Sequence, residues 1–222
     1  MNRYSVLERS YSAQRIKDQY HRVAWFYDTW SRLTEDKAAH RLLELAEIRN
    51  GSRVLEVAVG TGRLFADIVR FNANGHTEGV ELSRDMLEKA RLRMGRESGG
   101  ASYHLQEANA YKLPFEDNGF DYLFNAYLLD LLPEQDFPRI LKEFHRVLKP
   151  GSRLATASFS FGNRPVHRIW YRLAQSVPSL LTGCRPIELT QPLQQAGFEI
   201  IHQEEVSQNT FPSAVVIARS PD

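Results

Sequence analysis

Residues 53–62 read Arg-Val-Leu-Glu-Val-Ala-Val-Gly-Thr-Gly, and this stretch decides the fold. Its apolar first half is typical of a buried strand. The Gly60-Thr61-Gly62 turn follows at once and leads into a helical pattern over residues 63–71. Glycines in such a turn allow left-handed backbone conformations and let a ligand approach the main chain. The stretch therefore predicts a strand, a tight turn and a helix whose unpaired N–H groups face a ligand.

Strand-like and helix-like segments alternate on both sides of this stretch. Strands are expected at residues 53–58, 76–82, 101–107, 120–127, 153–159, 198–206 and 214–218. Helices are expected at residues 63–71, 84–96, 137–148, 166–176 and 189–196, and as two pieces within residues 10–48 that are broken near 31–34. Helical connections make the earlier strands parallel, whereas the last two have no helix between them and are expected to form an antiparallel hairpin. The prediction is an α/β fold with a doubly wound, seven-stranded, mostly parallel sheet and a ligand at the carboxyl ends of its strands.

Two classes of ligand compete for the glycine turn. A dinucleotide fingerprint has the form G-x-G-x-x-G, whose third glycine packs the helix on the strand, but that position is Phe65 here. The stretch instead resembles the S-adenosylmethionine site of class I methyltransferases, in which an acidic residue precedes Gly-x-Gly-x-Gly. Glu56 is the acid, and Ala58, Gly60 and Gly62 hold the three glycine positions. Ala58 departs from the family's commonest pattern.

Later blocks of the sequence extend the resemblance. Residues 79–86 (Gly-Val-Glu-Leu-Ser-Arg-Asp-Met) resemble the family's second block. Glu81 follows the glycine turn by about 20 residues, where a carboxylate can hold both hydroxyls of a ribose. Met86 is expected to pack on the adenine face. Residues 109–115 (Asn-Ala-Tyr-Lys-Leu-Pro-Phe) resemble the block that contacts adenine, with Asn109 in place of the usual Asp.

Two further blocks complete the pattern. Residues 120–133 and residues 148–154 resemble the family's fourth-strand segment and the turn before its fifth strand. The five blocks occur in the family's order and cover roughly half the chain. The resemblance implies a Rossmann-like methyltransferase fold with S-adenosyl-L-methionine as cofactor. The implied cofactor-binding residues are Tyr20, Glu56, Ala58, Gly60, Thr61, Gly62, Glu81, Leu82, Met86, Asn109, Ala110 and Asn125.

The composition limits the function further. The chain has 222 residues and a formal net charge of +1, which predicts a single domain over residues 1–222 and argues against general nucleic-acid binding. Its one cysteine, Cys184, excludes an intramolecular disulfide, and the seven histidines lack metal-ligand spacing, so no metal is expected. There is no membrane-spanning apolar run and no signal-peptide pattern. We therefore expect a cytoplasmic protein, either a monomer or a homodimer.

Methyl transfer from a sulfonium mainly requires that two reactants be positioned, because the cofactor is already activated. An acceptor that must lose a proton also needs a base. In similar proteins a segment like residues 1–48, rich in aromatic side chains, forms an N-terminal helical lid over the cofactor, and Tyr27 within it is one catalytic candidate. Asp130, where many family members have histidine, is the other candidate. A helix cap or a solvated loop acid fits Asp130 equally well.

The segment that connects the fifth and sixth strands is expected to form part of the acceptor pocket, as it does in similar proteins. Residues 144–187 carry seven Lys or Arg and no Asp or Glu. Residues 161–189, which overlap this stretch, are expected to form an inserted cap on the substrate side, as in similar proteins. The candidate substrate-binding residues are Tyr127, Arg164, Arg168 and Arg172. A basic and aromatic segment fits an anionic or lipid-like acceptor, and it also fits peripheral contact with a membrane.

These patterns predict an enzyme that transfers a methyl group from S-adenosylmethionine to a small-molecule or amphiphilic acceptor. The chain resembles quinone-biosynthesis C-methyltransferases and bacterial phospholipid N-methyltransferases, and the residues do not choose between them. Two alternatives stay open. One is a non-catalytic module that binds S-adenosylmethionine. The other, less favoured, is a nucleotide-dependent oxidoreductase, against which Phe65 and the terminal strand pair argue.

Overall fold

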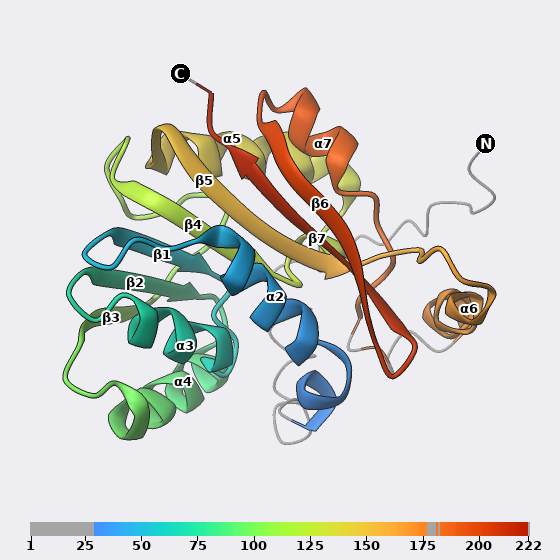
Figure 1. Cartoon of the computed structure of the whole chain (residues 1–222), viewed down its shortest axis with the longest axis horizontal. Coiled ribbons are helices and arrows are strands. Elements are labelled where there is room, and N and C mark those ends of the chain that lie inside the picture. Colours follow the sequence, from blue (N-terminus) through green and yellow to red (C-terminus); the bar gives the residue numbers. More distant parts are fainter. Residues whose placement is uncertain (1–28, 177–180, 182, 222) are drawn as a thin grey trace.

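A seven-stranded sheet forms the centre of the computed structural model, which describes residues 29–176, 181 and 183–221 (Figure 1). The strand order is β3-β2-β1-β4-β5-β7-β6. The strands are β1 (Arg53–Val57), β2 (His76–Glu81), β3 (Ser102–Glu107), β4 (Phe120–Ala126), β5 (Leu148–Phe159), β6 (Glu199–Gln208) and β7 (Phe211–Arg219). The first five strands are parallel, and β7 is antiparallel to both β5 and β6. The predicted mostly parallel sheet and its antiparallel C-terminal hairpin are confirmed.

Helices cover both faces of this sheet (Figure 1). One layer contains α2 (Asp36–Ala46), α3 (Arg63–Phe71) and α4 (Arg84–Glu97). The other contains α5 (Phe137–Val147) and α7 (Thr190–Gln195), while α6 (Arg168–Ser176) lies beyond the end of the sheet. Each layer seals its own apolar core, with Leu42 of α2 and Ile68 of α3 in one and Phe144 of α5 and Leu193 of α7 in the other. The layers leave the carboxyl edge of the strands for a ligand, as the doubly wound arrangement requires.

Several predicted boundaries differ from the observed ones. Residues 29–34 are helical, and the break that was expected near residues 31–34 is a turn at Glu35. The helix expected from residue 166 begins at Arg168, because a 3-10 turn over Pro165–His167 precedes it. The terminal strands are longer than predicted and meet in a tight turn at Asn209 and Thr210, which both have positive φ. Threonine seldom adopts this conformation, so the sequence carried no signal for so short a turn.

The packing of α3 on the sheet explains why the large residue Phe65 stands where a dinucleotide fingerprint has its third glycine. Phe65 is fully buried, and its ring lies over Gly79 of β2. A Cβ at Gly79 would lie 2.6 Å from Phe65 Cε2 and 2.6 Å from Leu105 Cδ2, far inside van der Waals contact. A dinucleotide fold gains close helix–strand packing from a glycine on the helix. Here the glycine of the contact, Gly79, is on the strand, and the large side chain, Phe65, is on the helix.

The Gly79→Ala substitution tests this packing. We expect it to lower the free energy of unfolding by about 1–3 kcal/mol, because the added methyl overpacks a filled core. The control is Gly95→Ala on α4, where an added Cβ meets nothing within 4 Å; it should raise stability by up to about 1 kcal/mol. Urea denaturation measures both, and combining Gly79→Ala with Phe65→Leu should restore part of the loss. Equal effects of the two glycine substitutions would contradict the packing argument.

Candidate active site

The turn after β1 has a left-handed backbone at each position of the glycine pattern. The φ angles of Ala58, Gly60 and Gly62 are 66°, 57° and 82°. The amides of Ala58 and Val59 both donate to the carbonyl of Val80, at 2.9 and 3.1 Å, which ties the turn to the end of β2. The family's preference for glycine at the first position therefore reflects backbone conformation, and alanine keeps that conformation at a cost of about 1–2 kcal/mol.

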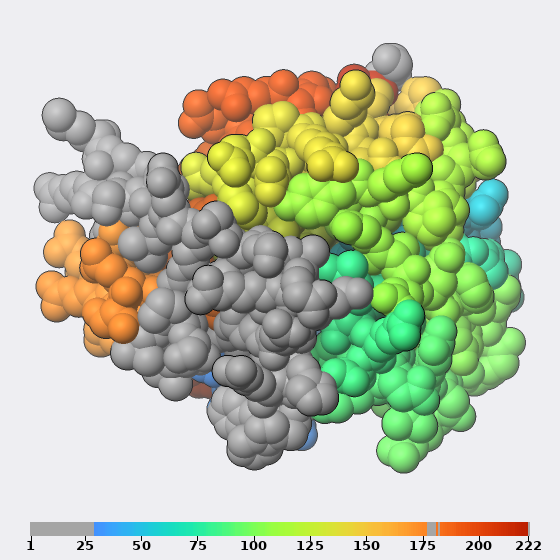
Figure 2. Space-filling model, turned by 180° about the vertical axis from the view of Figure 1, so that it is seen from behind, coloured from blue at the N-terminus to red at the C-terminus, as the bar shows by residue number. Residues whose placement is uncertain are grey.

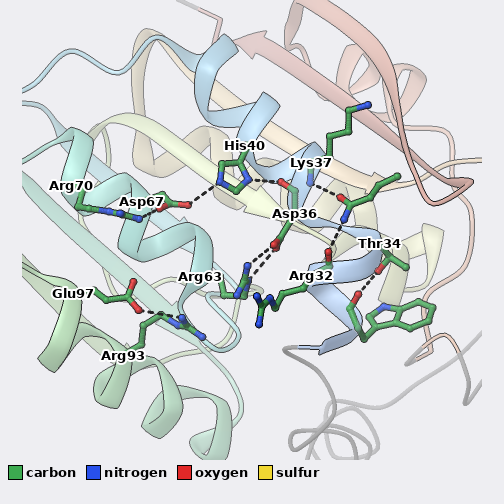
Figure 3. A network of polar contacts seen from close by, with 12 residues as sticks. Arg32, Thr34, Asp36, Lys37, His40, Arg63, Asp67, Arg70, Arg93 and Glu97 are labelled. Carbon is green, nitrogen blue, oxygen red and sulfur yellow. Dashed lines mark hydrogen bonds and ion pairs between the residues drawn. The ribbon is translucent and has the colours of Figure 1, made fainter.

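The helices next to the turn hold it from the other side. A Cβ on Gly62 would lie 3.0 Å from Cα and Cβ of Ala90, so α3 begins in close contact with α4. The Arg93 guanidinium of α4 donates to the carbonyl of Thr61 at 3.0 Å. Arg63, at the start of α3, pairs through two nitrogens with Asp36 of α2 (Figure 3). Three helices thus hold one turn in place.

Glu81 lies at the end of β2 and faces the turn. Its carboxylate accepts hydrogen bonds from Gly60 N at 2.9 Å and from Ser83 N at 2.8 Å, and the residue is 9% exposed. Ser83 also caps α4, since its hydroxyl accepts a bond from the amide of Met86. The two amide bonds fix the orientation of the carboxylate at the sheet edge. A fixed, slightly exposed carboxylate beside a glycine turn is the arrangement that binds vicinal hydroxyls in doubly wound folds.

Glu56, on β1, is the second carboxylate of the site. It is 2% exposed, and its Oε2 atom has no hydrogen-bond partner. Burial raises the pKa of this carboxyl well above its ordinary value, and the nearby charges of Glu81 and Asp67 raise it further. A buried acceptor without a partner is costly, and a ligand that brings a cationic N–H group would remove the cost. The amino group of S-adenosylmethionine has this chemistry, so the residues present fit the cofactor.

A narrow cavity of about 60 Å³ lies beside the glycine turn and Glu56. It lies between the glycine turn, the helical residues before α2 and the end of β4. Its polar lining includes Glu56, Ser31, Glu35 and the aromatic Tyr127. Pockets for whole ligands are usually roughly 300 Å³ or larger, so this cavity suits one end of a ligand whose remainder follows the sheet edge.

Glu35 and Ser31 are site residues that the sequence pattern did not indicate. Glu35 is 4% exposed, and its carboxylate accepts a hydrogen bond from the indole of Trp30 at 3.2 Å. Ser31 lies in the helical residues before α2 and Glu35 in the turn that follows them, and the sequence of this region looks amphipathic and ordinary. A carboxylate at the turn between two helices was the available signal, but only the fold brings it to the glycine turn.

Tyr127 closes the β4 side of the cavity in a left-handed backbone conformation, with φ of 55°. Its hydroxyl is 2.7 Å from the hydroxyl of Ser213, on β7. Burial raises the pKa of this phenol well above its ordinary value, and the charge of Glu35 adds to the effect. The hydroxyl is therefore neutral near pH 7 and acts as a hydrogen-bonding group. Strained residues of this kind cluster at functional sites.

Several of the predicted cofactor residues lie outside the cavity lining. Asn125 is fully buried and its side chain donates to the carbonyl of Val57 at 3.1 Å, which joins β4 to β1. Met86 is 1% exposed, within the apolar face of α4. Leu82 and Ala110 are half-buried, and Asn109 is exposed and accepts a bond from the amide of Tyr111. Tyr20 and Tyr27 lie outside the described residues.

Asp130 requires a correction, because it was expected to reach the cleft. Its side chain is fully buried and does not line the cavity; it accepts a hydrogen bond from Phe159 N at 2.9 Å. Arg185, which is 1% exposed, donates its amide to the Asp130 carbonyl and its guanidinium to Glu134 and to the Leu132 carbonyl. Burial raises the pKa of the Asp130 carboxyl to about 7. This cluster fastens the segment that follows β4 to the end of β5 and to the region of Arg185.

In the folded protein, the seven basic residues of residues 144–187 fall into two groups. Arg146 pairs with Glu143 and Asp117, Lys149 with Asp121, Arg153 with Glu47, and Arg185 with Glu134. The other three arginines, Arg164, Arg168 and Arg172, are exposed around α6, and none of them lines the cavity. Four of the seven basic residues of this stretch are therefore paired with acidic residues outside it.

Neither a metal site nor a membrane span was found within the described ranges. In residues 29–176, 181 and 183–221, no group of three or more His, Cys, Asp or Glu is placed to hold a metal ion. In the same part of the chain, no helix is both long and apolar enough to cross a membrane.

Comparison with known proteins gives the class of this site. Residues 54–151 match a family described as "Methyltransferase domain". Over 163 residues, 71% of the chain, it is 32% identical to the ubiquinone/menaquinone biosynthesis C-methyltransferase UbiE of Pseudomonas entomophila. The UbiE protein of Pseudomonas putida (strain GB-1) is 31% identical over 175 residues, 76% of the chain. The chain covers 62% and 66% of these relatives' own lengths, less than two thirds of each.

Solved structures share the fold at lower identity. The [4+2]-cyclase SpnF superposes with a TM-score of 0.77 at 19% identity, covering 95% of this chain and 96% of that one. A SAM-dependent methyltransferase of Methanosarcina mazei superposes with a TM-score of 0.67 at 20% identity, covering 81% and 97%. Together with the sequence matches, these findings confirm the resemblance: the chain belongs to the class I S-adenosylmethionine-dependent methyltransferases. S-adenosyl-L-methionine is accordingly its cofactor.

The Asp130→Asn substitution tests the buried cluster. The folded state raises the Asp130 pKa from 3.8 to about 7, so the folded chain keeps a proton that the unfolded chain releases. Stability associated with this group is therefore present below about pH 4 and is lost as the pH rises through about 7. Asparagine still accepts the bond from Phe159 N but does not titrate. From about pH 5 to pH 8, wild type should lose roughly 2–3 kcal/mol of unfolding free energy relative to the variant. Urea denaturation curves that shift in parallel at both pH values would refute the role.

Proposed function

We propose that this chain methylates a small amphiphilic acceptor, with a ring carbon of a quinone-type molecule as the preferred position. The observation that carries the methyl-transfer site is the Glu81 carboxylate, held by the amides of Gly60 and Ser83 beside the left-handed turn. The C-methyltransferase titles of the relatives support the ring-carbon acceptor. The cytoplasmic location and the oligomeric state remain predictions.

In this proposal the chain binds the cofactor along the carboxyl edge of β1, β2 and β3. Glu81 holds the ribose hydroxyls, and Glu56 faces the amino group with the oxygen that has no partner. The main chain of Ala58, Gly60 and Thr61 lets the ligand approach closely, since no side chain beyond a methyl covers the first two positions. The adenine is assigned to the half-buried and exposed residues that follow β2 and β3, namely Leu82, Asn109 and Ala110.

The acceptor side of the proposal centres on Tyr127 and Glu35. Both line the cavity that leads to the glycine turn. Glu35 replaces Asp130 as the carboxylate closest to a reacting acceptor, because Asp130 is bonded to Phe159 in the protein interior. Bound S-adenosylmethionine supplies an activated methyl group, and the protein's part is to position the acceptor and exclude water. Residues 1–48 and 161–189 keep their proposed roles as lid and substrate-side cap.

A non-catalytic binding module is the alternative that deserves a direct test. One close structural neighbour is described as a cyclase, and a shared fold does not settle the reaction. Binding of the cofactor alone therefore cannot separate the two functions. Formation of S-adenosylhomocysteine can, because only methyl transfer produces it.

The Glu81→Ala substitution tests the cofactor site. Removing a charged acceptor of two hydroxyl hydrogen bonds should weaken S-adenosylmethionine binding about 10- to 100-fold in calorimetry. Glu78→Ala provides a control on the same strand, since Glu78 contacts His76 and His104 away from the turn; it should bind the cofactor as wild type does. Unchanged affinity in Glu81→Ala would show that the ribose lies elsewhere. Calorimetry with NADH in place of S-adenosylmethionine should give no binding, and NADH binding would favour the oxidoreductase alternative.

A turnover assay tests the reaction itself. Wild-type protein is incubated with S-adenosylmethionine and a quinol that lacks its ring methyl group, and mass spectrometry follows S-adenosylhomocysteine and the product. We expect stoichiometric product methylated at carbon, and a much lower rate in Glu35→Gln with cofactor affinity retained. An aminophospholipid serves as the competing acceptor. Methylation of this lipid alone would show that the methyl group goes to nitrogen and not to a ring carbon. Cofactor binding without S-adenosylhomocysteine from any acceptor would establish the binding module instead.

A further inference from the structure

The segment around α6 is positively charged and exposed, unlike the rest of the basic stretch. Arg164, Arg168 and Arg172 are all exposed, and no Asp or Glu occurs between residues 144 and 187. In Figure 1, α6 stands at one end of the molecule, beyond the carboxyl end of β5 and beside the turn between β6 and β7. Figure 2 shows the orange side chains of this segment at the surface of that end. The positive charge is therefore local, although the whole chain is nearly neutral.

The outer face of α6 combines this charge with apolar side chains. Arg168 and Arg172 are one helical turn apart and form a row along the exposed side of the helix, and Ile169 lies beside this row. Ile169 is 56% exposed, and Val166 just before the helix is 38% exposed. We call Arg164, Val166, Arg168, Ile169 and Arg172 the α6 surface. Large exposed apolar side chains surrounded by arginines are typical of interfacial helices.

The inner face holds the helix firmly against the protein. Ala174 is fully buried, and the ring of Trp170 packs edge-on against Phe211 and Trp30 with centroids 5.2 and 6.1 Å apart. The Trp170 indole also donates to the hydroxyl of Thr210, in the turn between β6 and β7, at 3.1 Å. The exposed arginines therefore lie on a helix whose opposite side packs against the core.

The approach to α6 is fixed as well, by a contact between buried His167 and Glu205. His167 is 1% exposed, and its ring lies 3.5 Å from a carboxylate oxygen of Glu205. Glu205 also accepts a hydrogen bond from the amide of Asn163. A Cβ on Gly162 would collide with the His167 ring, so the glycine is needed for this close approach. Glu205 thus lies at the base of the segment and is engaged there, while Arg164, Arg168 and Arg172 are exposed.

We propose that the α6 surface docks on the anionic leaflet of a lipid membrane. Three arginines attract anionic headgroups, and Val166 and Ile169 are placed to enter the boundary between headgroups and acyl chains. The two exposed apolar side chains, Val166 and Ile169, are surrounded by arginines, and this charge pattern matches a uniformly negative surface. The α6 surface and the cavity share the carboxyl end of the sheet, so docking brings the active site close to membrane-borne amphiphiles. Docking itself does not depend on the proposed function; only this supply of acceptor does.

Vesicle co-sedimentation tests the proposal with the full chain. Wild type is mixed with vesicles of phosphatidylcholine alone or of phosphatidylcholine with phosphatidylglycerol, at low and high salt. We expect binding only to the anionic vesicles, with loss of binding as salt screens the charges. Each arginine near such a surface strengthens binding about fivefold. The triple variant Arg164→Gln, Arg168→Gln, Arg172→Gln should therefore lose binding roughly a hundredfold, and Ile169→Ser should lose it several-fold.

Matched controls on α4 separate docking from general charge. The variant Arg84→Gln, Arg91→Gln, Arg96→Gln removes three exposed arginines, and Leu92→Ser replaces a residue 58% exposed, close to the 56% of Ile169. Both should bind the anionic vesicles as wild type does. Absence of wild-type binding, or equal losses from the α4 and α6 triple variants, would overturn the proposal, as would binding only to a soluble acidic protein.

Cofactor calorimetry on the same α6 variant keeps the two proposals apart. We expect S-adenosylmethionine affinity to be unchanged, which also shows that the variant folds. Lost vesicle binding with intact cofactor affinity supports docking. Failure of the turnover assay in wild type, with vesicle binding intact, would refute the proposed reaction and leave the docking surface standing.

Discussion

The left-handed turn after β1 is the constraint on which the rest of the site depends. Its amides are tied to the Val80 carbonyl, and Gly62 brings α3 into contact with Ala90 of α4. These contacts align the ends of β1 and β2, so that Glu81 reaches the amide of Gly60. Without positive φ at these positions the turn would not close, and the carboxylate would lose the group that orients it.

Buried carboxylates set the electrostatic character of the protein. Glu56 and Asp130 are both enclosed, and burial raises the pKa of each. Each has one oxygen with no hydrogen-bond partner. Their surroundings differ, however. The other oxygen of Asp130 accepts a backbone bond from Phe159 in the interior near Arg185, whereas Glu56 lines a cavity beside the glycine turn. The surroundings of Asp130 are those of a structural anchor. The surroundings of Glu56 are suited to a ligand that carries a cationic group.

The sheet and the cofactor region could be predicted from the sequence because their signals are local. A strand, two glycines and a helix are contiguous at residues 53–71, and Glu81 follows at a spacing that one connecting helix determines. Long-range packing carries no such signal. In the sequence, Phe65 shows only that the third glycine of a dinucleotide fingerprint is absent. Its packing over Gly79 is a contact between distant parts of the chain. Asp130 looked like an exposed loop acid because Arg185 and Phe159 are far away in the sequence. The same holds for Glu35, and for four basic residues whose acidic partners lie outside their stretch.

A crystal structure of the chain with S-adenosylmethionine tests the central claim most directly. The account predicts both ribose hydroxyls within hydrogen-bonding distance of the Glu81 carboxylate, and the amino group of the methionine end facing Glu56. The main chain of residues 58–61 should lie against the ligand with its left-handed turn retained. Cofactor bound away from Glu81, or a glycine turn that rearranges to admit it, would contradict the account.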